Sequence, residues 1–205
     1  MAALGAVLVV AGLSLIDIRS VSLFYQIDRT EAVLSALATL GVVVLGAVNA
    51  ILFAVVLALL RFIKLISRPR VEILGKIEGL PGLHSLERHR GGEEIPGALL
   101  FRFNAPIVFF NAPYFKRELL RVVDEAGPNL RHVVIDLLPV TTIDATGLLT
   151  LTELVGILEP RGIRLNAAGR ATEWRNWAQS RGFAGDRIRV FPTLRQAVRP
   201  IGTSQ

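Results

Sequence analysis

An unbroken apolar stretch restricts what this chain can fold into more than any other feature. Residues 32–60 contain no charged side chain over 29 positions. As one straight helix this stretch would measure about 43 Å, whereas the hydrocarbon core of a bilayer is about 30 Å thick. The stretch is therefore either one strongly tilted span or a hairpin of two short helices. We favour the hairpin, broken around Gly46–Asn49, because glycine weakens a helix and asparagine can cap or turn one.

Two further segments complete the predicted membrane region, residues 1–66. Residues 2–16 are uncharged and short for a full span. A cleaved signal peptide would carry a basic leading region and a small-residue cleavage site, and this segment shows neither. A span whose outer end is cut off at Met1, or an interfacial helix, fits better. Residues 17–31 mix aromatic and charged side chains, which suits the headgroup layer. We expect an interfacial connector there, with a soluble loop as the alternative.

Positive charge predicts the orientation of the chain in the membrane. Arg61, Lys64, Arg68 and Arg70 follow the last apolar residue without an acidic neighbour. Lys and Arg are in excess on the cytoplasmic side, so these four residues are predicted orientation anchors and the rest of the chain is cytoplasmic. The net charge of +6 could also indicate nucleic-acid binding. No nucleic-acid partner is expected, because the sequence has no basic stripe interleaved with aromatic residues.

The next segment, residues 67–97, is predicted to be a linker. It is rich in glycine, proline and charge, with a candidate short strand at 71–74. His84, Glu87 and His89 could suggest a metal site, but a hydrated loop is favoured because no further ligand or helical frame accompanies them. The chain contains no cysteine, so disulfides, thiolate nucleophiles and zinc-finger spacings are excluded.

From residue 98 onward, strand patterns alternate with helix patterns. This alternation predicts one α/β domain over 98–205, with a mainly parallel or mixed sheet and helices packed on it. Trp174 and Trp177 are expected to be packing residues of the third helix. The predicted strands are 98–103, 107–110, 132–137, 163–168 and 188–191, and the predicted helices are 112–126, 146–158, 172–180 and 194–198.

The turn after the third predicted strand carries the most informative motif. It reads Ile143-Asp144-Ala145-Thr146-Gly147 and follows a strand that ends near Asp136. This turn resembles the Asp-Ser-Ser/Thr-Gly turn of STAS domains, which occur in anti-sigma-factor antagonists and in the cytoplasmic tails of SulP sulfate-permease-type anion transporters. The resemblance covers almost the whole chain in order. In the membrane region, Asp28–Glu31 is similar to the entry of the last SulP membrane helices and Ser67–Pro69 to their exit. Further along, Leu86–His89 is similar to the SulP linker and Phe101–Pro106 to its strand pair. The fold class that it implies is α-helical membrane segments followed by an α/β STAS domain.

The resemblance also implies a role for individual residues of this turn. In antagonist STAS domains the hydroxyl matching Thr146 is the phosphorylation site, and a helix N-terminus can accommodate a phosphate. Ala145 departs from the family, which often has serine there. The alternative is that Asp144 or Thr146 caps the helix while Gly147 permits a tight turn. We favour this alternative for a transporter tail.

The function implied is that of the C-terminal fragment of a SulP-type sulfate/anion transporter, multi-pass in the inner or plasma membrane. Its STAS domain would serve regulation, assembly or partner docking, and the chain is not expected to transport alone. The implied partners are membrane lipid and either a separately encoded transporter core or a second STAS domain in a homodimer. Sulfate or a similar anion would bind only together with the core. The alternative is a membrane-tethered signalling module switched by phosphorylation at Thr146. No enzyme activity or cofactor is expected, because the sequence has no phosphate-binding loop, dinucleotide fingerprint or nucleophile elbow.

Overall fold

The computed structural model describes residues 3, 5–7, 10–11, 29–88, 91–170, 172–174 and 187–202. The chain forms two compact units, Met1–Ile63 and Lys64–Gln205. The predicted span at 2–16 lies mostly outside the described residues. The predicted connector at 17–31 also lies outside them, except that residues 29–31 begin a helix.

Two apolar helices meet at a glycine in the first unit. Helix α3 spans Arg29–Leu45, and α4 spans Ala47–Ser67. Between them Gly46 has a φ of 81°, a left-handed conformation that glycine adopts without steric cost. A Cβ placed on Gly41 would lie 3.5 Å from the Cβ of Ala50, so small residues allow the two helices to approach closely. The break therefore falls at Gly46, while the crossing of a membrane by both helices stays a prediction.

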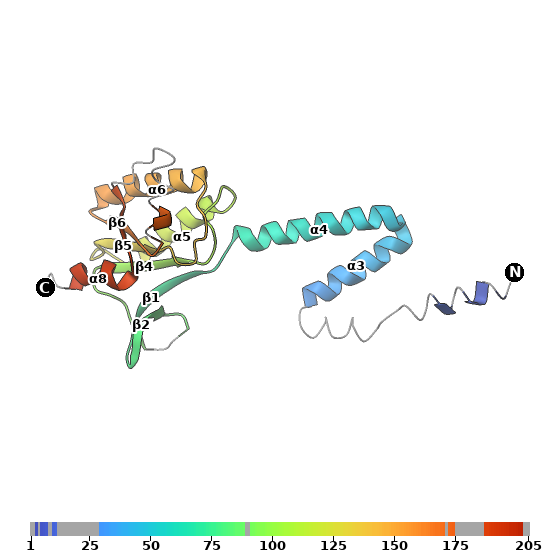
Figure 1. Cartoon of the computed structure of the whole chain (residues 1–205), viewed down its shortest axis with the longest axis horizontal. Helices are drawn as coiled ribbons and strands as arrows, with labels where there is room; N and C mark the ends of the chain where they lie inside the picture. Colours follow the sequence, from blue (N-terminus) through green and yellow to red (C-terminus); the bar gives the residue numbers. More distant parts are fainter. Residues whose placement is uncertain are drawn as a thin grey trace. The chain divides into compact units, whose positions relative to one another are not determined.

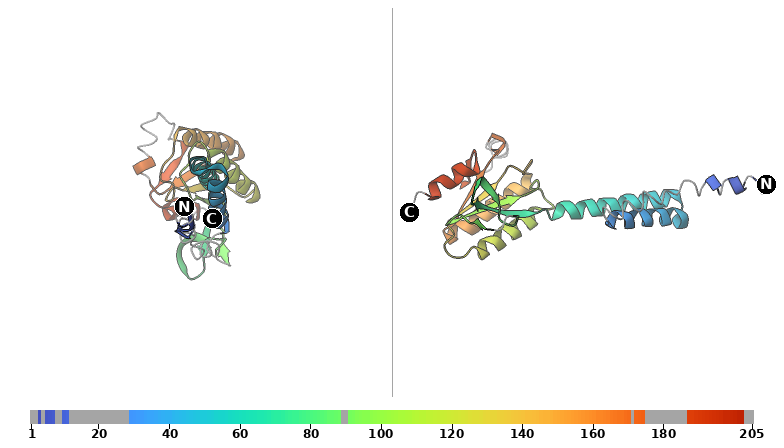
Figure 2. Two further views of the ribbon diagram at one scale, coloured as in Figure 1. Left: turned by 90° about the vertical axis from the view of Figure 1, so that its right-hand side faces the viewer. Right: turned by 90° about the horizontal axis from the view of Figure 1, so that it is seen from below.

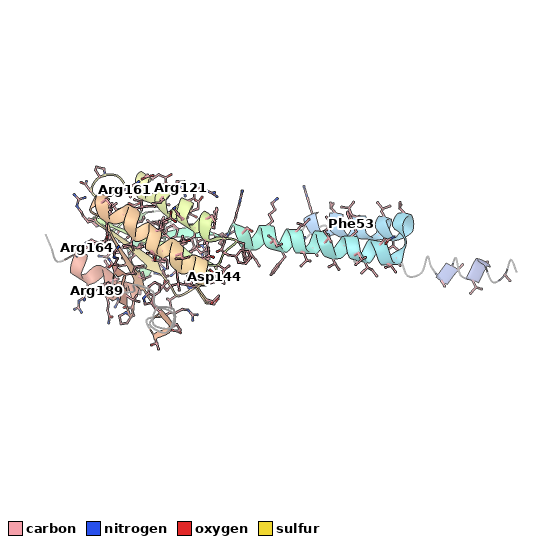
Figure 3. The ribbon with its side chains drawn as sticks, turned by 90° about the horizontal axis from the view of Figure 1, so that it is seen from above. Phe53, Arg121, Asp144, Arg161, Arg164 and Arg189 are labelled. Carbon is pink, nitrogen blue, oxygen red and sulfur yellow. The ribbon has the colours of Figure 1, made fainter. Side chains whose placement is uncertain are left out.

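Helix α4 has the length and apolarity of a membrane span. Among the described residues it is the one helix that meets both criteria: Ala47–Lys64 has a mean hydropathy of 2.1, and 6% of it is buried. Most of its large apolar side chains are exposed, and Phe53, labelled in Figure 3, is 47% exposed. One face, with Ala50, Ala54 and Leu57, is buried or half-buried. A helix that exposes apolar groups over most of its remaining surface suits a lipid environment better than water.

A mixed sheet organises the second unit (Figure 1). The strand order is β2-β1-β4-β5-β6-β7, with β3 beside β1. Strand β1 pairs antiparallel with β2, β3 and β4, whereas β4, β5, β6 and β7 run parallel. The predicted α/β class with a mixed sheet is confirmed. The strands are β1 (Val71–Ile77), β2 (Leu80–Ser85), β3 (Gly92–Glu93), β4 (Ala98–Phe103), β5 (His132–Asp136), β6 (Arg164–Ala168) and β7 (Arg189–Phe191).

Helices cover both faces of this sheet (Figures 1 and 2). Helices α5 (Ala112–Glu125) and α6 (Ala145–Leu158) cover one face, and α8 (Leu194–Gly202) covers the other. The larger core lies under α5 and α6, where the ring of Phe115 meets those of Phe101 and Phe103 edge to face, with centroids 5.7 and 5.1 Å apart. Successive strand residues point to opposite faces, and both faces are covered, so the central strand β4 is apolar except at Arg102.

Residues 67–97 are not the linker that the sequence predicts. They contain β1, β2 and β3, and β1 lies inside the sheet, with Val71–Leu74 paired to β4. The local pattern hides this role because the stabilising partner, β4, comes much later in the chain. Gly75 lies in a crowded part of β1, where a Cβ would be 2.4 Å from the carbonyl oxygen of Glu93. In the part of the chain that the structure describes, no group of metal-ligating residues gathers around His84 and Glu87, and His89 lies outside it.

The strand predicted at 107–110 is also wrong. Only Ile107 forms a β-bridge, with Ile143, and Phe109 and Phe110 lie in a turn before α5. The chain turns here because the side-chain oxygen of Asn111 accepts a hydrogen bond from the backbone N–H of Val108 at 2.9 Å. The helix predicted at 172–180 is described only at 172–174, where Trp174 is buried in the larger core. Trp177 lies outside the described residues.

Candidate functional site

The chain enters the second unit at the edge of the sheet where the parallel strands end. Val71, at the start of β1, pairs with Phe103 at the end of β4. Along the same edge Arg102 is in register with Asp136, and Asp136 with Ala168. The loops that follow β4, β5 and β6 therefore gather where the chain arrives from α4. We name this region the carboxyl edge; it comprises residues 68–71, 104–111, 137–147 and 169–170.

Asp144 joins two loops of the carboxyl edge. One carboxylate oxygen accepts a hydrogen bond from the backbone N–H of Gly147 at 2.8 Å and thereby caps α6. The other oxygen accepts from the backbone N–H of Phe109, also at 2.8 Å. The backbone N–H of Asp144 donates to the carbonyl oxygen of Ile107 at 3.2 Å. A capping carboxylate is stabilising at a helix N-terminus, so this geometry is that of a structural cap.

Gly147 allows these loops to approach each other closely. A Cβ at this position would lie 2.5 Å from the carbonyl oxygen of Ile107 and 2.8 Å from Cγ2 of Ile143. Gly147 is buried, and it is absent from the described residues with positive φ. Close packing, rather than an unusual backbone conformation, is therefore what requires glycine here.

Thr146 lies in the first turn of α6, beside Asp144 and Gly147. Its side chain is exposed, and its carbonyl oxygen accepts a hydrogen bond from the hydroxyl of Thr150 at 2.8 Å. The first turn of a helix carries unpaired N–H groups and partial positive charge. An incoming phosphate could reach Thr146, and its phosphorylation stays a prediction.

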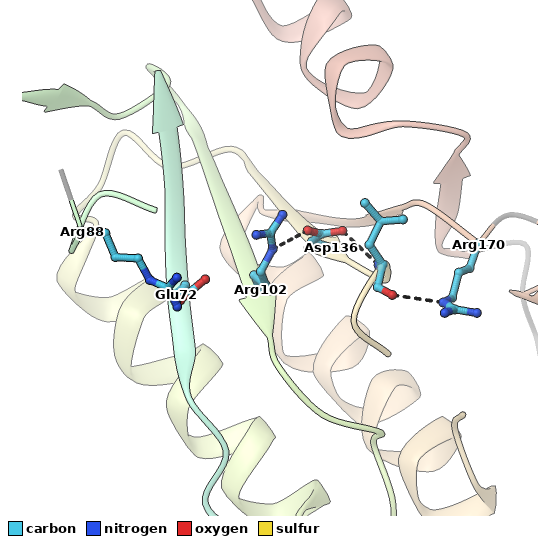
Figure 4. A network of polar contacts seen from close by, with 6 residues as sticks. Glu72, Arg88, Arg102, Asp136 and Arg170 are labelled. Atoms are coloured by element: carbon cyan, nitrogen blue, oxygen red, sulfur yellow. Dashed lines mark hydrogen bonds and ion pairs between the residues drawn. The ribbon is translucent and has the colours of Figure 1, made fainter. Parts of the chain in front are cut away.

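An ion pair with a buried carboxylate joins the ends of β4 and β5 (Figure 4). Asp136 is fully buried at the end of β5, and Nε of Arg102 donates to it at 2.6 Å. The second carboxylate oxygen accepts from the backbone N–H of Leu138 at 3.0 Å, and Nε of Arg170 donates to the Leu138 carbonyl at 3.2 Å. This network was not predicted from the sequence. Its signal was an acidic residue that ends an otherwise apolar strand.

The four predicted orientation anchors fall at the end of α4 and just after it. Arg61 is half-buried, whereas Lys64, Arg68 and Arg70 are exposed. Arg70 also lines a shallow cavity of about 380 Å³ beside Glu72, Tyr114 and Glu118. Two carboxylates in that cavity form ion pairs with arginines that also line it. Arg88 pairs with Glu72 at 2.5 Å (Figure 4), and Arg121 pairs with Glu118 at 3.0 Å. The cavity therefore has the character of a structural ion-pair cluster.

The opposite end of the domain is basic. Figure 3 shows Asp144 at one end of the domain and Arg164 and Arg189 at the other. Here His132 is in register with Arg164, and its buried Nδ1 atom has no hydrogen-bond partner among the described residues. Burial, followed by the positive charge of Arg164, lowers the pKa of His132 below its usual 6.5.

Comparison with known proteins identifies the family of this domain. A profile of the STAS domain matches residues 92–197. A probable sulfate transporter of Mycobacterium tuberculosis (strain H37Rv) is 33% identical over 162 residues, which cover 79% of this chain and 29% of that protein. High affinity sulfate transporter 2 of Stylosanthes hamata is 29% identical over 175 residues, or 82% of this chain and 26% of that protein.

A solved structure extends the likeness to the fold. The murine Slc26a9 anion transporter in the inward-facing state aligns over 89% of this chain and 30% of its own, with a TM-score of 0.79 and 16% identity. At that identity the likeness shows the fold alone. This chain spans between a quarter and a third of the length of the sequence relatives named above. The chain belongs to the STAS domain family and is related to the SulP-type sulfate transporters, which confirms the resemblance seen in its turn motif.

Proposed function

We propose that this chain is the regulatory and docking end of a sulfate-transporter-type assembly. Its helices would lie in the inner or plasma membrane as a multi-pass segment, with the STAS domain in the cytoplasm. The observation that carries the proposal is the position of the carboxyl edge. The loops with Asp144 and Thr146 lie at the sheet edge where the chain arrives from α4, so Arg68–Arg70 is a short connection between that edge and the apolar helix.

We further propose that the chain does not transport by itself. Substrate sites of secondary transporters lie near the bilayer midplane, between repeats of several helices. Helices α3 and α4 are too few to surround such a substrate path. A transporter core and a second STAS copy are the partners that fit this role, and sulfate or a similar anion would bind only together with the core.

Transport by the isolated chain can be measured directly. The purified chain is reconstituted in proteoliposomes, and uptake of radiolabelled sulfate is compared with that of protein-free vesicles. We expect equal uptake, because the two described helices, α3 and α4, are too few to enclose a substrate path. Uptake clearly above the protein-free level would overturn this part of the proposal.

Docking through the carboxyl edge can be measured by co-purification. The tagged chain is co-expressed with the membrane core of a SulP-type transporter, and recovery of the core is quantified. Asp144→Ala removes the contact between two loops of the edge and should lower recovery. The matched control is Asp124→Ala on α5, where the carboxylate of Asp124 makes an exposed ion pair with Arg161 at 2.7 Å. Equal recovery with both variants would exclude the carboxyl edge as the docking surface.

The exposure of Thr146 in the first turn of α6 supports a second candidate function, a switch operated by phosphorylation. Phosphate would add charge and acceptor oxygens at a helix N-terminus that attracts anions. The test is mass spectrometry of the chain purified from its native cells, together with a comparison of proteins bound by Thr146→Glu and by Thr146→Val. We expect a phosphate at Thr146. We also expect Thr146→Glu, but not Thr146→Val, to change the set of bound proteins. An unmodified Thr146 with identical partner sets would reject the switch.

A further inference from the structure

Two adjacent aromatic side chains of the carboxyl edge face outwards. Phe109 is 67% exposed and Phe110 is 38% exposed, and their rings meet edge to face with centroids 5.2 Å apart. The same domain buries Phe101, Phe103 and Phe115 completely. Exposed large apolar groups that lie together mark a contact surface more often than single ones do. We name Phe109 and Phe110 the phenyl pair.

The loop that carries the phenyl pair is held in place by buried hydrogen bonds. Asn111 is fully buried, and its side chain accepts from the backbone N–H of Val108 and donates to the carbonyl oxygen of Pro106, both at 2.9 Å. Asp144 accepts from the backbone N–H of Phe109 at 2.8 Å. The folded loop therefore presents the two rings to the outside.

A third contact of the Asn111 side chain places this loop beside the end of α4. The side-chain nitrogen of Asn111 also lies 3.5 Å from the carbonyl oxygen of Ile66, within hydrogen-bonding range. Ile66 follows Lys64, the last residue of the apolar segment, by two positions. Because a helix rises 1.5 Å per residue, this contact is about 3 Å along the helix from the end of that segment. The phenyl pair thus belongs to a loop next to the boundary of the apolar segment.

Three basic side chains, Lys64, Arg68 and Arg70, are exposed at this boundary. The cavity lined by Arg70 also contains the carboxylates of Glu72, Glu87 and Glu118. Of these, Glu72 pairs with Arg88 and Glu118 with Arg121. The described acidic groups of the neighbouring turn are engaged internally, Asp144 by two backbone N–H groups and Asp136 by Arg102. Cations beside a span attract anionic lipid headgroups, and aromatic rings favour the membrane–water interface.

We propose that the phenyl pair inserts into the boundary between headgroups and acyl chains of the bilayer that α4 crosses. Lys64, Arg68 and Arg70 hold anionic headgroups beside it, and together they clamp the carboxyl edge of the STAS domain to the membrane surface. This inference rests on the proposed membrane placement of α4. It assigns to Phe109 and Phe110 a lipid contact that the fold by itself does not require.

The absence of cysteine from the chain permits a site-specific test. Phe109→Cys is labelled with a small environment-sensitive fluorophore, and the full chain is reconstituted in vesicles of phosphatidylcholine and phosphatidylglycerol. Quenching by brominated acyl chains reports lipid contact, and quenching by iodide reports contact with water. Val55→Cys in α4 is the control for the span, and Asn129→Cys, exposed at the opposite end of the sheet, is the control for water. Phe110→Cys replaces Phe109→Cys if the latter does not fold.

The expected result is quenching by brominated lipid at positions 55 and 109 and by iodide at position 129. Each basic residue near an anionic surface contributes about fivefold to membrane binding. Quenching by lipid at 109 should therefore fall in vesicles of phosphatidylcholine alone and in the Arg68→Gln/Arg70→Gln variant.

Three results would overturn the inference. A label at 109 that iodide quenches as strongly as at 129, with 55 in lipid, rejects the clamp and leaves the span intact. Labels at both 55 and 109 in water reject the clamp and the proposed span together. A label at 109 shielded from both quenchers indicates a protein contact instead of lipid.

Discussion

Gly147 is the position of the carboxyl edge where an added methyl group has least room. Gly147→Ala would place a Cβ 2.5 Å from a backbone oxygen, which cannot move without shifting the loop around Ile107. We expect a loss of about 1–3 kcal/mol in the free energy of unfolding, as for other overpacked sites. The measurement is urea unfolding followed by circular dichroism.

The control for this prediction is on the same helix. Gly156 has nothing within 4 Å of an added Cβ, so Gly156→Ala should raise stability by up to about 1 kcal/mol through helix propensity. Equal stability of the two variants would show that the contact between Gly147 and Ile107 is looser than the structure indicates.

His132 gives the domain a predicted dependence of stability on pH. Its pKa is lowered in the folded state, so below about pH 6.5 the unfolded chain binds a proton that the folded chain resists. The contribution of His132 to the free energy of unfolding is therefore complete above about pH 6.5 and is lost as the pH falls below that value. His132→Phe should reduce the difference in unfolding free energy between about pH 7.5 and 5.5. His84→Gln is the control. If His132→Phe leaves the difference in unfolding free energy between the two pH values unchanged, the pKa of His132 is not lowered in the folded state.

At the scale of elements, the Arg102–Asp136 pair ties together β4, β5 and the loop after β6. Arg102→Leu leaves a fully buried carboxylate whose one hydrogen-bond partner among the described residues is the Leu138 N–H. We expect a loss of about 3 kcal/mol, the low end for a broken buried pair, because the Arg102 side chain is 26% exposed. The measurement is the midpoint of chemical unfolding.

Two further variants distinguish this pair from surface ion pairs. Arg102→Leu/Asp136→Leu should lose less than the sum of the two single changes, because no unpaired charge stays buried. Arg121→Leu removes two surface ion pairs, with Glu118 and Glu125, and should cost much less than Arg102→Leu because solvent screens these charges. Additive losses at Arg102 and Asp136 would show that the two residues are not coupled.

At the scale of the whole molecule, the folding unit begins before β1. A fragment of residues 68–205 contains every strand of the sheet, whereas residues 98–205 lack β1, β2 and β3. Without β1, strand β4 loses its antiparallel partner and the smaller core loses the fully buried Leu74. We expect the longer fragment to unfold cooperatively and the shorter one to lose the cooperative transition on heating. If both fragments unfold at the same temperature with equal cooperativity, the folded domain begins at residue 98 and does not require β1.

The sequence by itself determined the features that depend on neighbouring residues. The charge-free run at 32–60 and the alternation after residue 98 predicted apolar helices and an α/β domain, because helix and strand periods are local. Asp144, Thr146 and Gly147 were found together for the same reason, since one turn holds all three. The resemblance of that turn then identified the family.

Only the tertiary structure decided the features that join distant parts of the chain. It placed β1 inside the sheet beside β4, paired Arg102 with Asp136, and brought Asn111 next to Ile66. It also showed that Gly147 is needed because the loop of Ile107 packs against it. Each of these contacts links residues that are between 26 and 45 positions apart. No local pattern of polarity records such pairings, because they form only when the strands assemble and bring their loops to one edge.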